Sequence, residues 1–414
     1  MPSRPALAVA LLLVIAGLGT VWIQARSSAG IDFYQMWIGA RMAREAENFY
    51  SPETRAVMGE LYLRQAVADG ASPRQVAVAQ HRRNLEVLST PLLYTLYVFL
   101  QTDYERALLL FQLIVFAALA GWVVIFGRLF GFDNLLILLV LAVLLLAFEP
   151  VRSDAAVANM NHIMLLLLAL AGLQTARKRF ALAGAILAIA TLTKPYVILT
   201  FAVTYLFWIA ARRWRDLAQH AAGAAAATVV ALIASSAWFG SATIWLEWLR
   251  AFRAIPSSMI PIDLGNFALA ALTRPMSIVV FAAAVVALAV AAFRAKPGAS
   301  FDVAAIALGC VLFQFVSPLV WAHHLLLSVP LMLWLLRPAS SRPHQIAGAV
   351  GLALIAVEPW GTFVPTVTWV ALGVNAGLAV AFVAGASGLW ASGLRASGLG
   401  PRASGPPPVS APEA

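Results

Sequence analysis

The run ALAVALLLVIAGLGTVWI, residues 6–23, contains no charged side chain. A helix needs about 20 apolar residues to cross a bilayer core of about 30 Å, so this run and its flanks are long enough to span a membrane. Its position also fits a secretory signal peptide, but no clear cleavage site precedes Gly30 and many equally apolar runs follow. We therefore interpret it as the first transmembrane helix.

The composition of the whole chain is that of a polytopic membrane protein. Of its 414 residues, 62% are hydrophobic and 11% are charged, and the mean hydropathy is +0.86. Soluble domains carry about 25% charged residues. The net charge of +10 could indicate nucleic-acid binding, but the basic residues cluster between apolar runs, as in cytoplasmic loops. We expect membrane lipids as partners and no nucleic acid.

Twelve apolar segments predict an all-α polytopic fold with about twelve transmembrane helices. They are residues 5–24, 105–127, 134–148, 157–175, 180–193, 195–211, 217–238, 276–293, 302–316, 320–336, 345–357 and 366–384. Groups of Arg and Lys alternate with loops poorer in these residues, which places both termini in the cytoplasm. The apolar segment 90–101 is too short to cross, so we predict a re-entrant or surface helix on the outer face.

The transmembrane domain is predicted to cover residues 1–384. Its first outer loop, residues 25–103, holds eight acidic residues and eight arginines, so we expect a large neutral cap that contains juxtamembrane helices. The tail, residues 385–414, is rich in Gly, Ser and Pro and cannot bury a core. We predict that this tail is disordered and cytoplasmic.

The second outer loop covers residues 240–275. Its Trp245, Trp248 and Phe252 follow helical spacing, which favours an amphipathic helix at the membrane interface. An aromatic belt at the same interface is the simpler alternative.

Polar residues at the outer ends of membrane helices are costly and often functional. Asp32 is the first of these residues, directly after the first apolar run. With Gln35 three positions further on, it fits a helix N-cap with a capping-box partner. A carboxylate at this rim could also act as a general base that takes a proton from a hydroxyl group. The two roles are compatible.

Lys194 is the only lysine on the predicted outer side, and Pro195 interrupts the apolar run there. The next helix therefore begins with free backbone N–H groups beside a positive charge, which suits a phosphate. The alternative is an interfacial lysine whose amine reaches water.

Asn159, Asn161 and His162 open the fourth predicted span. Capping of the helix explains one asparagine better than two. We expect Asn159 to be the cap, and Asn161 or His162 to face a cavity.

The stretch SPLVWAHH, residues 317–324, carries Trp321, His323 and His324 at the start of another span. Neighbouring histidines point about 100° apart on a helix, and no partner follows at i+4, so a zinc site is not expected. We expect one histidine to face lipid headgroups and the other to face inward, where it could contact an anionic group. Because no carboxylate cluster offers hard ligands, we predict no metal and no cofactor.

Five stretches of the chain follow the order found in a known enzyme family. They are IDFYQMWIGARMA…ENFYSPE (31–53), LSTPLLYTLYVFL (88–100), ANMNHIMLLLLAL (158–170), AGAILAIATLTKPYVIL (183–199) and VSPLVWAHHLLLSVPLML (316–333). In these stretches the chain resembles the GT-C superfamily of polyprenyl-phosphate-sugar glycosyltransferases, most closely the bacterial polyprenyl-phosphomannose-dependent alpha-mannosyltransferases. It departs from that family at Thr90, where Pro is common, and at Ala158, where Gly is common.

The resemblance implies a GT-C-like helix arrangement in the bacterial inner membrane, with the active site on the extracytoplasmic face. It also implies transfer of a hexose, with mannose as the leading case, from a polyprenyl-phosphate-linked donor to a glycolipid or glycan hydroxyl with inversion. Asp32 would be the catalytic base, His323 or His324 would lie near the reacting groups, and Lys194 would lie near the donor phosphate. The predicted substrate-binding residues are Lys194, Asn159, Asn161, His162, Tyr34 and Trp321.

A transporter or flippase of lipid-linked sugars is the alternative from another class. The sequence places no charged residue near the middle of a predicted span and shows no inverted repeat, both of which transporters commonly have. A structural scaffold would leave the outer polar residues unexplained. These patterns favour an enzyme.

Overall fold

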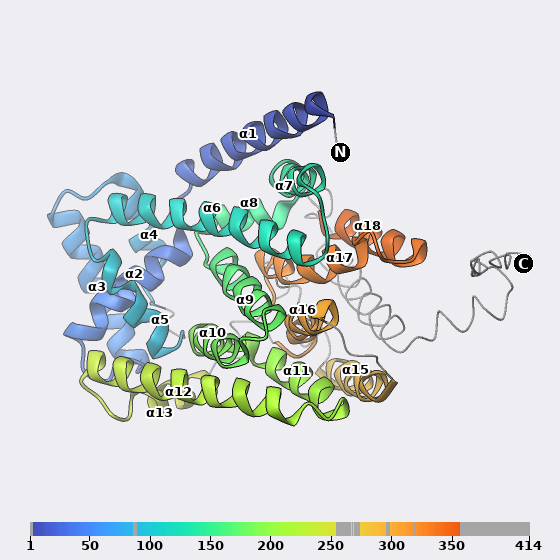
Figure 1. Cartoon of the computed structure of the whole chain (residues 1–414). Helices are drawn as coiled ribbons and strands as arrows, with labels where there is room; N and C mark the ends of the chain where they lie inside the picture. Colours follow the sequence, from blue (N-terminus) through green and yellow to red (C-terminus); the bar gives the residue numbers. More distant parts are fainter. Residues whose placement is uncertain are drawn as a thin grey trace, which may run out of the picture.

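Figure 1 shows a computed structural model of the chain, which is built from helices. The structure describes residues 3–85, 89–253, 266, 268, 274–294, 299–317 and 319–356. Within these residues every regular element is helical, as the all-α class predicts. The predicted span 366–384, the tail 385–414 and most of the loop 254–273 lie outside the described residues.

The predicted first outer loop forms a cap of short helices that follows α1 (Arg4–Ser27). These helices are α2 (Ile31–Glu45), α3 (Pro52–Ala68), α4 (Pro73–His81), α5 (Pro91–Leu96) and the 3₁₀ helix η1 (Tyr97–Leu100). In three of them the N-cap residue accepts a backbone N–H through its side-chain oxygen, and Pro follows as the first helical residue. These N-caps are Ser51, Ser72 and Thr90. This arrangement is favourable because the cap satisfies a free N–H and proline fits the first helical turn.

The remaining helices form the body beside this cap (Figure 1). Its first part consists of α6 (Tyr104–Leu129), α7 (Asn134–Ala147), α8 (Glu149–Val157), α9 (Asn161–Ala176), α10 (Phe180–Thr193), η2 (Pro195–Val197), α11 (Ile198–Ala210) and α12 (Trp214–Phe239). Its second part consists of α13 (Ile244–Arg253), α15 (Arg274–Arg294), α16 (Ala299–Val316), η5 (Ala322–Ser328), α17 (Val329–Leu336) and α18 (Arg342–Ile355). α9 contacts α6, α10 and α16, and therefore lies at the centre of the body.

Among the described helices, α1, α6 and α12 are each long and apolar enough to cross a membrane. α7 and α8 pass the same test together, but they are bent by 67° relative to one another. The apolar stretches of the other helices have 10–17 residues. At 1.5 Å per residue a 14-residue helix such as α10 extends about 21 Å, less than the bilayer core. These helices support a membrane protein, and they leave the predicted number of twelve spans unconfirmed.

Two helix pairs approach one another at backbone distance. A Cβ atom added to Gly184 of α10 would lie 2.0 Å from the carbonyl oxygen of His220 in α12. A Cβ atom added to Gly309 of α16 would lie 2.3 Å from the Cα of Thr200 in α11. Small residues allow such close approach between membrane helices. A side chain at either glycine would push its helix pair apart.

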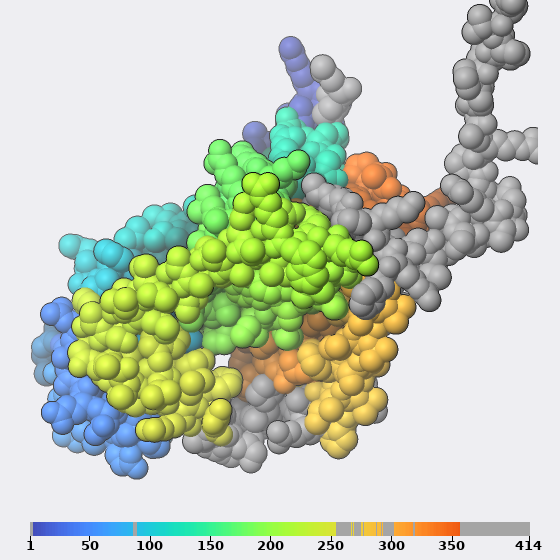
Figure 2. All heavy atoms as spheres, turned by 60° about the horizontal axis from the view of Figure 1, so that its bottom comes forward, coloured from blue at the N-terminus to red at the C-terminus, as the bar shows by residue number. Residues whose placement is uncertain are grey.

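α13 is amphipathic, as its aromatic spacing predicts. The ring centroids of Trp245 and Trp248 are 5.8 Å apart, as are those of Trp248 and Phe252. Trp248 is buried, whereas Phe252 is 46% exposed. Figure 2 shows that the surface is hollowed between the yellow residues around α13 and the gold residues of α15.

A separate groove of about 440 Å³ lies between α1, α6 and α7. It is lined by Leu7, Ala8, Leu11, Val124, Arg128, Asn134, Ile137, Leu138 and Leu141. This groove contains none of the residues that the sequence predicts for the site.

Candidate active site

The turn before α2 sets the position of Asp32. Gly30 is the N-cap of α2 with a left-handed backbone, φ 65° and ψ 54°, and no side chain caps the helix. A Cβ atom added to Gly30 would lie 2.8 Å from Cδ1 of Leu108, so glycine suits this turn both in conformation and in space. Asp32 is the second helical residue, where a carboxylate is favoured by the helix dipole. The prediction that Asp32 is an N-cap with Gln35 as its partner is therefore wrong.

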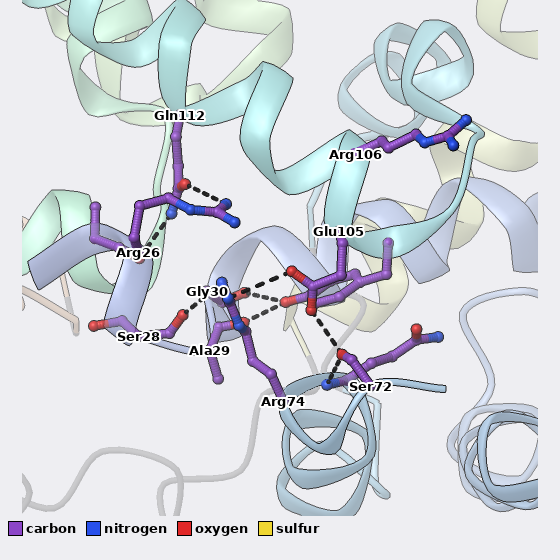
Figure 3. A network of polar contacts seen from close by, with 12 residues as sticks. Arg26, Ser28, Ala29, Gly30, Ser72, Arg74, Glu105, Arg106 and Gln112 are labelled. Atoms are coloured by element: carbon purple, nitrogen blue, oxygen red, sulfur yellow. Dashed lines mark hydrogen bonds and ion pairs between the residues drawn. The ribbon is translucent and has the colours of Figure 1, made fainter. Parts of the chain in front are cut away.

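Side chains from two neighbouring helices hold this turn (Figure 3). Tyr104 of α6 donates its hydroxyl to the carbonyl oxygen of Ala29, and the carbonyl oxygen of Gly30 lies 3.5 Å from the same hydroxyl. Arg74 of α4 donates to the carbonyl oxygen of Ser28 at 3.4 Å and forms an ion pair with Glu105, also at 3.4 Å. The backbone that leads into Asp32 is thus fixed by α4 and α6.

Asp32 has two polar partners from distant parts of the chain. Its Oδ2 accepts a hydrogen bond of 2.8 Å from Nδ2 of Asn159, and its Oδ1 lies 3.4 Å from Nη2 of Arg82. The Asp32 side chain is 21% exposed and that of Arg82 is 15% exposed. The carboxylate is therefore partly accessible and lies next to a positive charge.

The backbone before Asn159 also has a left-handed turn. Ala158 ends α8 with φ 52° and ψ 55°, and Met160 is the N-cap of α9 without a side-chain cap. The side-chain oxygen of Asn159 accepts the backbone N–H of Met160 at 2.7 Å. The prediction that Asn159 caps the helix is wrong, because its amide group is oriented toward Asp32.

His323 is the histidine that reaches this pair. Its Nε2 lies 3.4 Å from Nδ2 of Asn159, and the residue is 5% exposed. If Asn159 donates this hydrogen bond, a neutral His323 carries its proton on Nδ1. His324 points elsewhere: its Nδ1 accepts the backbone N–H of Trp321 at 3.0 Å, and its ring meets that of Tyr196 edge-on. The expected inward histidine is thus His323, and His324 packs against protein instead of facing headgroups.

Asn161 and His162 point into the interior of the body, where both are buried. Asn161 donates to Oδ1 of Asp154 at 2.8 Å and accepts the hydroxyl of Tyr196, also at 2.8 Å. His162 accepts the indole N–H of Trp122 at 3.1 Å. The two residues belong to a polar layer directly behind Asn159.

Lys194 lies in the break between α10 and η2 and is partly exposed. Its charge is within electrostatic range of Asp32 and Asp154. Beside it, the hydroxyl of Thr90 donates to the carbonyl oxygen of Thr193 at 3.1 Å and also caps α5. Thr90 thereby attaches the cap to the end of α10, a bond that a proline at this position could not make.

Two predicted residues have no described contact with this cluster. Tyr34 is buried in the cap, where its ring packs against Trp37 and Tyr104. Trp321 contributes its backbone N–H to His324. The structure therefore joins Asp32, Asn159 and His323 directly, and the other predicted residues surround them or lie apart.

Three residues in this region were missed by the sequence analysis. Arg82 was one of eight arginines in the cap, and nothing in its local sequence distinguished it. Asp154 could have been noticed, because it is an acid in the short predicted outer loop five positions before Asn159, which opens the next predicted span. The hydroxyl of Tyr97 is buried without a hydrogen-bond partner, and it lies within electrostatic range of both Asp32 and Asp154.

The arrangement combines a proton acceptor with two cations. Asp32 can take a proton from a hydroxyl group, while Arg82 and Lys194 provide positive charge for an anion nearby. In the described part of the chain, no group of three or more His, Cys, Asp or Glu side chains could hold a metal ion. This chemistry suits group transfer from an anionic donor to a hydroxyl.

The family comparison supports such a transfer. The family model described as Glycosyltransferase family 87 matches residues 88–320, more than half of the 414 residues. No curated protein and no solved structure matches the chain. The matched stretch includes Asn159 and Lys194. His323 lies three residues after its end, and Asp32 lies well before its start. On this evidence the chain belongs to glycosyltransferase family 87, a GT-C-like family of membrane glycosyltransferases.

Proposed function

We propose that this protein transfers a hexose from a polyprenyl-phosphate-linked donor to a hydroxyl group of an extracytoplasmic glycolipid or glycan. Mannose is the first sugar to test. The transfer inverts the configuration at the anomeric carbon, and the enzyme works in the bacterial inner membrane. Two observations support this function: the membership of glycosyltransferase family 87, and the chemistry available to the cluster of Asp32, Asn159 and His323.

The contact between Asp32 and Asn159 is the observation that carries the proposal. It brings together two residues that are 127 positions apart, and His323 adjoins them from a third part of the chain. A carboxylate that is partly exposed and oriented by an amide is suited to remove a proton from a bound hydroxyl. No described contact favours the alternative of a transporter.

The reaction needs a single displacement. Asp32 accepts the proton of the acceptor hydroxyl as that oxygen forms a bond to the anomeric carbon. The bond from the anomeric carbon to the phosphate oxygen breaks on the opposite face, and polyprenyl phosphate leaves with the electron pair. Lys194 and Arg82 stabilise the negative charge that develops on this phosphate.

His323 orients the reacting groups from the side of Asn159. The Asn159 amide links its Nε2 to Oδ2 of Asp32, so the base and the imidazole keep a fixed relation. Orientation of this kind lowers the barrier because the reactants do not have to find their geometry during the reaction.

Exchange of Asp32 for Asn tests the proposal. The purified protein in liposomes receives synthetic polyprenyl-phosphate donors with different hexoses, and formation of the glycosidic bond is measured. Asp32→Asn should lower the rate by about 10²–10⁴-fold, the usual loss for a positioned base.

Asp69→Asn is the matched control, because Asp69 is an exposed acid of the same cap. This control should transfer sugar at the rate of the wild type. A near-normal rate for Asp32→Asn would remove Asp32 from the mechanism. Movement of the labelled donor across the liposome without bond formation would favour transport instead.

A further inference from the structure

Asp154 is fully buried in α8, and the proposed reaction gives it no direct task. Its Oδ1 accepts a hydrogen bond of 2.8 Å from Nδ2 of Asn161. Its backbone carbonyl oxygen accepts the N–H of Asn159 at 3.1 Å and also the N–H of Ala158. Asp154 therefore holds both asparagines of the NMNH stretch, one through its side chain and one through its main chain.

The amide of Asn161 connects Asp154 to His323. Its Nδ2 also lies 3.3 Å from the carbonyl oxygen of His323, and its Oδ1 accepts the hydroxyl of Tyr196. If this amide were turned by 180°, its oxygen would face the Asp154 carboxylate and the His323 carbonyl. The carboxyl oxygen of Asp154, as an acceptor, therefore selects the orientation in which Asn161 donates to His323.

The second oxygen of Asp154 faces His162. Because Trp122 donates to Nδ1 of His162, a neutral His162 carries its proton on Nε2. This Nε2 lies 3.7 Å from Oδ2 of Asp154, and neither atom has a hydrogen bond. A buried carboxylate held this loosely costs stability compared with apolar packing. Stability therefore does not explain why an acid occupies this position.

We propose that Asp154 is a positioning residue of the transfer site. It fixes the amide of Asn161, which in turn holds His323 beside Asn159 and Asp32. Asp154 touches neither the donor nor the acceptor. This inference rests on the proposed function and adds to it a residue that acts through others.

Exchange of Asp154 for Asn tests the role by separating the rate from the amount of folded protein. The monodisperse fraction in size-exclusion chromatography gives the folded protein, and kcat is expressed per folded molecule. We expect kcat to fall by about 10²-fold, the size of loss that a misplaced reacting group can cause, while both KM values stay unchanged. A purely structural role would lower the folded fraction and leave kcat per folded molecule at the wild-type value, which would overturn the proposal.

A second pair of variants applies even if Asp154→Asn folds poorly. Asn161→Asp places two carboxylates together. The exchange variant, which carries both Asp154→Asn and Asn161→Asp, restores a hydrogen bond between the two positions. In the exchange variant the carbonyl of His323 still faces a carboxylate instead of an N–H donor. We expect this variant to melt at a higher temperature than Asn161→Asp and to remain about 10²-fold slow. Wild-type kcat in the exchange variant would overturn the proposal.

The Asp32→Asn variant, measured in the same experiment, distinguishes the two proposals. If Asp32→Asn is inactive and Asp154→Asn has wild-type kcat, only the positioning role fails. If Asp32→Asn transfers sugar at the wild-type rate, Asp32 is not the catalytic base and the proposed function itself fails.

Discussion

Two aspartates are buried in the described part of the chain, and their surroundings differ. Asp302, in α16, has both oxygens 2.8 Å from Nη1 of Arg213 and accepts the indole N–H of Trp208 at 2.9 Å. Asp154 has one amide at 2.8 Å, and its second oxygen has no hydrogen bond. The first carboxylate is paired with a cation, and the second is held by neutral groups.

Asp302 and the candidate site lie at opposite ends of α16. Asp302 is near the start of α16, whereas Gln314, near its end, donates to the carbonyl oxygen of His324. The ion pair between Asp302 and Arg213 links the start of α16 to the start of α12, because Arg213 is the N-cap of α12. Both acids are buried, but they differ in whether both carboxyl oxygens have a hydrogen-bond partner. The comparison teaches that this difference, more than burial, separates a structural acid from one beside a candidate site.

The largest effect that the comparison predicts is on stability at Asp302. Asp302→Asn leaves Arg213 without its main partner, and breaking a buried pair costs about 3–5 kcal/mol. We expect about 3 kcal/mol less free energy of unfolding, because Arg213 keeps Asp216 at 2.8 Å. Denaturant titration in detergent measures the change.

The same Asp302→Asn variant serves as the control for the site. Its kcat per folded molecule should equal that of the wild type, since Asp302 has no described contact with Asp32 or His323. If Asp302→Asn lowered kcat and left the free energy of unfolding unchanged, Asp302 would not be the purely structural acid of the two.

A smaller effect is expected for the cation beside the site. Lys194→Gln removes a charge that the proposal assigns to the donor phosphate, and such a bond contributes about 2 kcal/mol. The kcat/KM for the donor should therefore fall by roughly 30-fold. Steady-state kinetics with varied donor measures this, and replacement of Arg106, an exposed cation at the start of α6, by Gln should show no loss. Equal kinetics for both variants would mean that Lys194 does not bind the phosphate.

The smallest effect concerns the left-handed turn before Asn159. Ala158 has φ 52°, a conformation that costs an alanine about 1–2 kcal/mol and glycine almost nothing. Ala158→Gly should therefore raise the free energy of unfolding by about 1 kcal/mol. Ala155→Gly, within the same helix α8, should lower it by about the same amount. Destabilisation by both exchanges would contradict the left-handed backbone at residue 158.

The sequence predicted the helices well where apolar runs end at clear breaks. The predicted span 180–193 has the bounds of α10, because Lys194 and Pro195 end the run. The predicted cap was also found as helices, since Ser51 and Ser72 mark helix starts locally. Helix α8 was missed because its acids and Arg152 resemble a loop, and only contacts with distant helices bury Asp154.

The site was predicted less completely, for a physical reason. Residue type and the predicted position at the outer rim drew attention to Asp32, Asn159 and His323, and the structure places these three in contact. The capping assignments of Asp32 and Asn159 were wrong, because a local rule cannot anticipate a hydrogen bond across 127 residues. Arg82 had no signal of its own, because only the folded cap brings it to Asp32.

The close contact of α10 with α12, and of α11 with α16, limits how the proposed lipid-linked donor can arrive. A lipid tail entering sideways needs a gap between neighbouring helices, and these two seams leave no space even for a methyl group at Gly184 or Gly309. Both seams are thus closed to an isoprenoid chain unless whole helices separate. If the donor is the proposed polyprenyl phosphate, its long tail must come to the site along a different flank of the protein.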